Sequence, residues 1–322
     1  MTTNNLVSFI IPHKGRFEML KETLRSISEQ AYPLDKIEVI VVSQTPEIES
    51  TPLLDNNKLN LKTILLPESK TISALRNHGV TQAAGQHLAF LDADIFISPN
   101  WITCMLSHLH NGEERAIVSA MQICNPSAPP LEHIRTCLSN AELDTNVAFL
   151  PGRNLFLARH SFDKIGGFPE HLITCEDYFF TDKAAQLGNL YYTSDATYIH
   201  LGEDKVFSEM FKKETWRGQS NLQSIQGRRI PLREIPSFIL PLGICLSLLA
   251  ALVSLLFQAY PLALLFFLLG AGPLLAYSIR LHRLSKEVVN FSSIFKFYAV
   301  YFPARAIGTL AGLFKSIGAN HT

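Results

Sequence analysis

The feature that most restricts this fold is a stretch of 45 residues, 235–279, that contains no Asp, Glu, Lys or Arg. A helix that crosses a bilayer needs about 20 apolar residues, so the stretch is long enough for two crossings. Gln258-Ala259-Tyr260-Pro261 interrupts it with a polar side chain, an aromatic ring and a helix-starting proline. We therefore predict two transmembrane helices, at about 235–257 and 262–279. A buried helical hairpin in a soluble core is the alternative interpretation.

Basic residues flank this stretch on both sides, whereas the turn within it carries no charge. They are Arg228, Arg229 and Arg233 before it, and Arg280, Arg283 and Lys286 after it. By the positive-inside rule, both flanks lie in the cytoplasm. We thus expect a multi-pass protein of the inner (cytoplasmic) membrane, with a membrane region over 231–322. Within that region 291–314 is apolar but contains Lys296 and Arg305, which favours an amphipathic helix in the interface over a third crossing.

Residues 1–230 read as a soluble domain in which strands alternate with helices. Strands are predicted at 7–11, 37–42, 61–66 and 88–91, with helices at 16–30 and 69–84. This order predicts an α/β domain with a mostly parallel sheet covered by helices on both faces. Pro12 is expected to stop the first strand. Residues 95–200 indicate a mixed half whose strand order the pattern leaves open.

Composition excludes several other classes of protein. The 28 basic and 28 acidic residues balance, so we expect no nucleic-acid partner. Five cysteines show no C-x-x-C spacing, so neither a zinc site nor a disulfide framework is expected. The first five residues are polar and the apolar run after them is short, so no signal peptide is expected.

An Asp-Ala-Asp triplet, 92–94, follows the apolar run Leu88–Leu91. A buried strand that ends in two carboxylates places them where open α/β sheets bind their ligands. Mg²⁺ and Mn²⁺ accept one or two carboxylates and complete their coordination with substrate phosphates. The triplet therefore suggests a metal–diphosphate site, with ordinary turn chemistry as the alternative.

Several landmarks occur in a fixed order and together resemble the family 2 glycosyltransferases with the GT-A (nucleotide-diphospho-sugar transferase, Rossmann-like) fold. The resemblance covers roughly residues 6–220 and implies transfer of a sugar from a nucleotide-diphosphate donor, with inversion, to a glycan or lipid-linked acceptor in envelope polysaccharide synthesis. The landmarks are the strand ending Ile11-Pro12, the strand 37–42, Ala74–Gly79, Phe90–Asp94, Gly152-Arg153-Asn154, Phe162–Phe168 and Glu176-Asp177.

The resemblance also implies roles for particular residues. Mg²⁺ or Mn²⁺ would be bound by Asp94, with Asp92 near the ribose and His200 as a further ligand. Trp216 and Arg217 would lie on the acceptor side. The donor site would comprise Pro12, His13, Ser43, Arg76, Asp92 and Asp94. Arg76 could instead be a surface or structural arginine, His200 could be structural, and Trp216 could pack where the domain meets the membrane.

Inverting transfer needs a carboxylate that deprotonates the acceptor hydroxyl. The resemblance assigns this role to Asp177, with Glu176 in support. The pair could also mark the start of a helix that Thr174 caps, because acidic residues favour the first helical turn. Gly166-Gly167-Phe168 fits the turn that precedes the pair in this family, and could also be plain loop chemistry.

Two departures from the family pattern leave alternatives open. The second strand ends in Ser43-Gln44 where an acidic pair usually contacts the nucleobase, so the base is undefined. No Gln-x-x-Arg-Trp is present, so addition of one sugar is expected rather than polymerisation. A polyprenyl-phosphate sugar transferase is the alternative enzyme, and a catalytically silent membrane scaffold is the alternative from another class. The donor sugar, the acceptor and the oligomeric state are not defined by the sequence.

Overall fold

The computed structural model describes residues 5–49, 59–111, 113–219, 235–285 and 288–319. The chain forms two compact units. The first comprises residues 1–124 and 142–202, and the second comprises 125–141 and 203–322. A helical segment from the middle of the chain thus belongs with the C-terminal part. The domain boundary that we predict at 230 lies outside the described residues.

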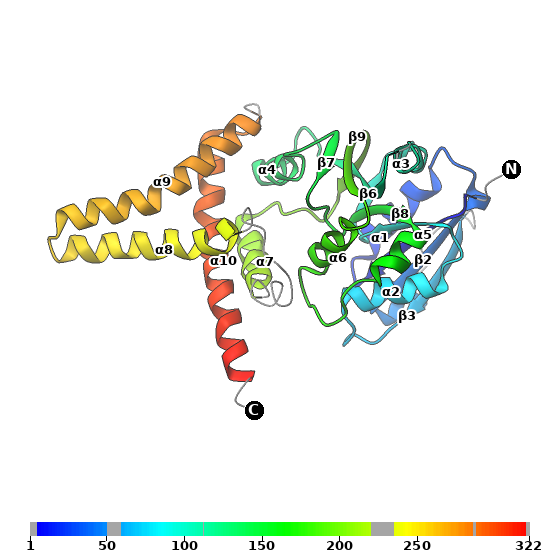
Figure 1. Cartoon of the computed structure of the whole chain (residues 1–322), viewed down its shortest axis with the longest axis horizontal. Helices are drawn as coiled ribbons and strands as arrows, with labels where there is room; N and C mark the ends of the chain where they lie inside the picture. Colours follow the sequence, from blue (N-terminus) through cyan, green and yellow to red (C-terminus); the bar gives the residue numbers. More distant parts are fainter. Residues whose placement is uncertain (1–4, 50–58, 112, 220–234, 286–287, 320–322) are drawn as a thin grey trace. The chain divides into compact units, whose positions relative to one another are not determined.

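The first half of the first unit has the predicted alternation of strands and helices (Figure 1). Its four strands are parallel and lie in the order β3-β2-β1-β4. The elements are β1 Val7–His13, α1 Phe17–Ser28, η1 Leu34–Lys36, β2 Ile37–Ser43, η2 Pro46–Glu49, β3 Asn60–Leu65, α2 Ile72–Gln82 and β4 His87–Leu91. The predicted α/β class is confirmed.

The first strand does not stop at Pro12, as we expected, but continues to His13. Pro12 lacks a backbone N–H and cannot serve a strand that is paired on both sides. The pairing of β1 with β4 ends at Ile10, so beyond that residue β1 pairs only with β2. Pro12 is tolerated because it lies where the strand has a single neighbour.

The second half of the sheet mixes parallel and antiparallel pairs. β8 is antiparallel to both β4 and β6, and β9 is parallel to β6 but antiparallel to β5 and β7. The remaining elements of this unit are β5 Ile95–Ile97, α3 Trp101–Leu109, β6 Arg115–Ile123, β7 Thr145–Val147, β8 Asn154–Ala158, α5 Arg159–Ile165, α6 Glu176–Ala184 and β9 Asn189–His200.

Strand β1 is buried on both faces, which explains its nearly continuous apolar sequence. Phe9 and Ile11 pack in one core cluster with Leu20 and Leu24 of α1. Ile10 belongs to the opposite cluster, with Val80 of α2. Helices therefore cover both faces, as predicted. From β1 the chain continues to β2 and β3 on one side of that strand, and it then returns to β4 on the other side. The carboxyl end of β1 is therefore the topological switch point, where such sheets bind ligands.

The second unit is helical. Its elements are α4 Pro130–Ser139, α7 Phe207–Gly218, α8 Ile235–Leu256, α9 Tyr260–Leu284 and α10 Phe291–Ala319. Helices α8 and α9 lie side by side as a hairpin, and α10 runs across the end of the hairpin where α9 finishes (Figure 1). Residues of α4, α7, α8, α9 and α10 share one apolar core.

Three helices within the described residues are long and apolar enough to cross a membrane: α8, α9 and residues 291–314 of α10. Their mean hydropathies are 2.6, 2.1 and 1.2, so α10 is the least apolar. The two predicted spans correspond to α8 and α9, although α9 continues to Leu284. The interfacial position of α10 stays a prediction. Of the basic flanking residues, Arg228, Arg229, Arg233 and Lys286 lie outside the described residues.

Helix α10 packs unusually closely against α7. A Cβ atom on Gly308 would overlap the backbone oxygen of Thr215, and one on Gly218 would lie 2.9 Å from the Gly308 Cα atom. Glycine at these positions lets the two backbones approach. Nε of Arg305 on α10 lies 3.1 Å from Oε2 of Glu214 on α7. The face of α10 that carries Arg305 is thus covered by a polar helix.

Candidate active site

Asp94 is held in a buried position directly after β4. Its side chain is only 6% exposed, and its Oδ2 lies 3.5 Å from His200 Nε2 and 3.0 Å from Arg16 Nη1. Burial alone would raise the pKa of Asp94, but the hydrogen bond and charge of His200 and the charge of Arg16 lower it below its ordinary value. The carboxylate is therefore ionised at neutral pH.

Strand pairing brings His200 to Asp94 from 106 positions along the chain. β5 begins immediately after Asp94, and Ile95 pairs with His200 at the end of β9. The Leu201 N–H also donates to the Asp94 carbonyl oxygen at 2.8 Å. A carboxylate oxygen and an imidazole nitrogen this close together suit a divalent cation, and the imidazole suits Mn²⁺ better than Mg²⁺. The residues present thus fit the expected metal.

Two residues that the sequence did not single out complete this part of the site. Arg16 precedes α1 with a left-handed backbone (φ 52°), next to Gly15 (φ 62°), and this turn directs its side chain to Asp94. Gly202 lies against the same carboxylate: a Cβ atom there would overlap Asp94 Oδ2 and lie 2.7 Å from Arg16 Nη1.

Replacing Gly202 with alanine is expected to impair metal binding without unfolding the protein. The added methyl group must displace the Asp94 carboxylate, and a displacement of this size at a reacting group can cost about 10²-fold in rate. We expect Gly202→Ala to lower Mn²⁺-dependent turnover by about 10- to 100-fold. Gly243→Ala, where nothing lies within 4 Å of the new Cβ atom, is the matched control. Wild-type metal dependence in Gly202→Ala would contradict this arrangement.

Arg76 forms hydrogen bonds with two further acidic residues of the site, Asp92 and Glu176. Its Nη2 donates to Asp92 Oδ1 at 2.9 Å and to the Gly152 carbonyl oxygen at 3.3 Å, while Nη1 donates to Glu176 Oε1 at 2.9 Å. The residue is 1% exposed, so the interpretation as a surface arginine is wrong. Burial would lower the pKa of its guanidinium, but the charges of Asp92 and Glu176 raise it. Arg76 therefore fixes the relative position of the two carboxylates.

Phe168, which ends one of the family landmarks, packs against Arg76 and is hydrogen-bonded to Asn77. The Arg76 guanidinium lies over the Phe168 ring, 5.0 Å from the centroid, and Asn77 exchanges hydrogen bonds with the Phe168 backbone. The turn before Phe168 requires glycines, because Gly166 and Gly167 have φ of 84° and 81°. The segment is therefore a turn that needs glycine. It is also connected to the acidic pair, because Phe168 contacts Arg76 and Arg76 donates to Glu176.

The acidic pair begins helix α6, which starts at Glu176. Asp177 accepts hydrogen bonds from the Gly152 N–H at 3.2 Å and the Tyr178 N–H at 2.8 Å. The N-cap is Cys175, with a left-handed backbone and no side-chain cap, so the expected Thr174 cap is wrong. Burial and the adjacent Asp177 charge raise the pKa of Glu176. Gly152 therefore links Asp177 to Arg76, and through Arg76 to Asp92.

The ends of β1 and β2 meet at the switch point. His13 Nδ1 lies 2.9 Å from Ser43 Oγ, and Pro12 and His13 pair in register with Val42 and Ser43. Burial lowers the pKa of His13, so its imidazole is neutral at pH 7. Among the described residues, His13 Nε2 has no hydrogen-bond partner although it is buried. Gln44 is used structurally, since its amide donates to the Pro67 and Lys70 carbonyl oxygens.

The expected acceptor-side residues lie in the second unit. Trp216 is 51% exposed on α7. Arg217 Nη1 lies 2.6 Å from Glu214 Oε1, and Arg135 and Arg305 contact the same buried carboxylate. Burial would raise the pKa of Glu214, but these three arginines lower it. Arg217 therefore has a structural partner, and the acceptor roles of Trp216 and Arg217 remain predictions.

Cys104, His108 and Asp195 form a second cluster of possible metal ligands in the first unit. His108 Nε2 lies 2.9 Å from Asp195 Oδ2, and Arg115 Nη1 lies 3.0 Å from His108 Nδ1. A guanidinium can only donate, so Nδ1 accepts and Nε2 carries the proton. Burial, followed by the Asp195 charge, raises the pKa of the Cys104 thiol to about 11. The Cys104 thiol is therefore protonated at neutral pH, and His108 and Asp195 are already hydrogen-bonded to each other.

The chain is similar in sequence to known glycosyltransferases. The model of the "Glycosyl transferase family 2" family matches residues 8–166. Glycosyltransferase AglE of Haloferax volcanii is 27% identical over 241 residues, which are 73% of this chain and 79% of AglE. The poly(ribitol-phosphate) beta-N-acetylglucosaminyltransferase TarS of Staphylococcus aureus is 25% identical over 212 residues, and the match spans 64% of this chain but only 36% of TarS.

A solved structure shows the same fold. The mannosyltransferase PcManGT of Pyrobaculum calidifontis, determined in complex with GDP-Man and Mn²⁺, is 19% identical, with a TM-score of 0.62 over 96% of this chain and 88% of that protein. The mixed sheet is that of a glycosyltransferase with the GT-A fold. Within that class, residues 8–166 match family 2 of the glycosyltransferases, and the chain is similar to glycosyltransferase AglE.

Proposed function

We propose that this glycosyltransferase moves one sugar from a nucleotide-diphosphate donor, with inversion and with the help of Mn²⁺ or Mg²⁺, to a glycan or lipid-linked acceptor in cell-envelope polysaccharide synthesis. The observation that carries the proposal is the grouping of six acidic or basic residues around the switch point of the sheet. Asp92, Glu176 and Asp177 share the network of Arg76, and Asp94 adjoins Asp92 with His200 at its carboxylate.

The chemistry that this network supports is inverting displacement. Asp94 and His200 would hold the divalent cation, which supplies charge stabilisation to the departing diphosphate. Asp177 would take the proton from the acceptor hydroxyl, because backbone N–H groups fix its orientation while the side chain stays partly exposed. Arg76 keeps Asp92 on the donor side and Glu176 beside the base. His13 would offer its buried Nε2 to the donor.

We further propose that α8 and α9 cross the inner membrane while the first unit faces the cytoplasm. The flanking basic residues and the uncharged turn between the helices support this orientation. Helix α10 would lie in the interface, because it runs across the α8–α9 hairpin and pairs Arg305 with a carboxylate of the polar helix α7 (Figure 1). Such an anchor suits an acceptor that remains attached to the bilayer.

Nucleotide binding tests the proposal directly. The purified full-length protein is titrated calorimetrically with UDP, GDP and dTDP, each with Mn²⁺ and again with excess chelator. We expect heat with at least one nucleotide, at a Kd of roughly 1 μM to 1 mM, and a loss of binding on removal of the metal. No heat with any of the three in Mn²⁺ would contradict a nucleotide-diphosphate donor. Binding that persists with the chelator would contradict the metal site.

A further inference from the structure

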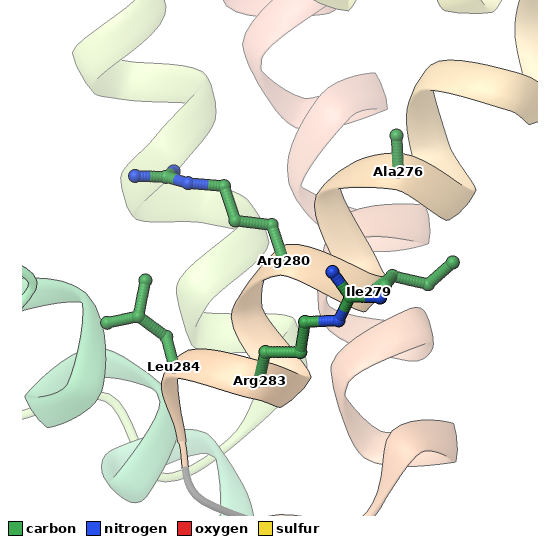
Figure 2. A pocket seen from close by; sticks show the side chains of 5 residues that line it. All are labelled: Ala276, Ile279, Arg280, Arg283 and Leu284. Atoms are coloured by element: carbon green, nitrogen blue, oxygen red, sulfur yellow. The ribbon is translucent and has the colours of Figure 1, made fainter.

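The exposed side of α9 near its C-terminal end contains an open pocket of ≈ 610 Å³ (Figure 2). It is lined by Ala276, Ile279, Arg280, Arg283 and Leu284. Spacings of three and four residues place these side chains on one side of a helix. The opposite side, with Leu274 and Leu281, is buried in the core of the second unit. The pocket therefore lies on the surface of α9 that the protein itself leaves uncovered.

Two cations in this pocket have no acidic partner among the residues that the structure describes. Arg280 and Arg283 are both exposed, and neither forms an ion pair with a carboxylate in the part of the chain that the structure describes. In the same unit Arg135, Arg217 and Arg305 all contact Glu214. Figure 2 shows the Arg280 guanidinium extending away from the helix and the Arg283 guanidinium beside Ile279. The pocket thus combines an alkyl border with two guanidinium groups that no described carboxylate pairs.

The position of the pocket along α9 indicates its depth in the bilayer that α9 is proposed to cross. Arg280 is the first charged residue after the 45 uncharged residues, and α9 is long and apolar enough to cross a membrane. The apolar border at Ala276 and Ile279 therefore belongs to the hydrocarbon end of the helix, and the guanidinium groups belong to the headgroup layer. Guanidinium groups bind phosphate oxygens in pairs, so a phosphate in this layer is a complementary ligand.

We propose that this pocket binds an anionic phospholipid of the bilayer. Its headgroup phosphate accepts hydrogen bonds from Arg280 and Arg283, and its acyl chains contact Ala276 and Ile279. The alkyl border favours a lipid over a free phosphate ion, which would gain nothing from apolar contact. This site is separate from the chemistry proposed for the first unit, and it requires no sugar transfer.

Native mass spectrometry of the full-length protein released from mixed phosphatidylglycerol and phosphatidylcholine nanodiscs tests the site. We expect the wild-type protein to retain phosphatidylglycerol preferentially, and the double variant R280A/R283A to lose that preference by about 30-fold, from two cationic contacts at the membrane surface. R280K/R283K should retain part of it. The control K205A/K212A removes two exposed positive charges of the same unit outside the pocket and should behave as wild type.

Three outcomes would overturn the proposal. The first is equal retention of phosphatidylglycerol by R280A/R283A and wild type, with both proteins folded by circular dichroism. The second is displacement of the lipid by millimolar inorganic phosphate, which would identify a free-anion site. The third is retention of an added polyprenyl phosphate in preference to phosphatidylglycerol through the same arginines, which would assign the pocket to an acceptor lipid.

Discussion

Asp94→Asn is expected to abolish metal-dependent sugar transfer, with kcat/KM falling by at least about 10³-fold, the scale on which a metal's charge stabilisation acts. The substitution preserves size but replaces a charged oxygen by an amide. Because the pKa of Asp94 is lowered, its carboxylate is ionised throughout the neutral range, so the variant removes a full charge. His200, 3.5 Å away, would remain without its carboxylate partner for the cation.

Asp195→Asn is the matched control for this prediction. Asp195 also pairs with a histidine in the first unit, His108, but its side chain is 69% exposed and lies in the cluster with Cys104, outside the proposed site. Turnover is measured across Mn²⁺ concentrations, and Mn²⁺ binding is measured separately by calorimetry. The fold should survive, because Arg16 is 58% exposed and can be hydrated once it loses Asp94. Metal-dependent turnover by Asp94→Asn at the wild-type rate would exclude Asp94 as a ligand.

The parts of the fold that sequence reasoning predicted are those set by local patterns. Strands β1 and β2 are short β-branched runs, and α1 has apolar residues at helical spacing, so each element is recognisable by itself. Their alternation then determines a parallel sheet. The order β4-β8-β6-β9-β5 was not predictable in this way. It depends on parallel and antiparallel pairing between segments far apart in sequence, which no local pattern encodes.

The residues of the candidate site also differ in whether a local sequence pattern predicts them. Asp92 and Asp94 were found because they follow an apolar strand, and Arg76 was found through a family resemblance. The contact of Arg16 with Asp94 depends on a left-handed turn at Gly15 and Arg16, which an arginine rarely adopts. The need for Gly202 depends on a side chain 108 positions earlier. Neither constraint has a local signature, so only the three-dimensional structure reveals them.

The prediction for Arg217 illustrates that a segment which resembles one in a family does not by itself establish the role of each residue in it. Arg217 was assigned to the acceptor because its segment resembles one in the family. The structure shows that its guanidinium neutralises Glu214, together with Arg135 and Arg305. A buried carboxylate with three cationic partners is strongly destabilised when its partners are removed. Loss of activity on substitution of Arg217 would therefore report on the helix packing as well as on any acceptor contact.

Asp177→Asn is the second substitution with a large expected effect. If Asp177 removes the proton from an acceptor hydroxyl, the amide cannot replace it, and kcat should fall by about 10²- to 10⁴-fold with donor affinity unchanged. The fold should persist, because the remaining amide oxygen can still accept from one of the two backbone N–H groups, those of Gly152 and Tyr178. Asp182→Asn, on the same helix α6, is the control and should retain wild-type turnover.

The acceptor determines how this result is interpreted. A phosphate acceptor is already anionic and needs no general base, whereas a sugar hydroxyl must lose its proton during attack. Full activity of Asp177→Asn would therefore exclude base catalysis by this residue and favour transfer to a polyprenyl phosphate. A loss of kcat with a hydroxyl acceptor, together with nucleotide binding equal to that of wild type, would assign the proton transfer to Asp177. Weakened nucleotide binding would instead indicate that the substitution acts through Gly152 and Arg76 on Asp92.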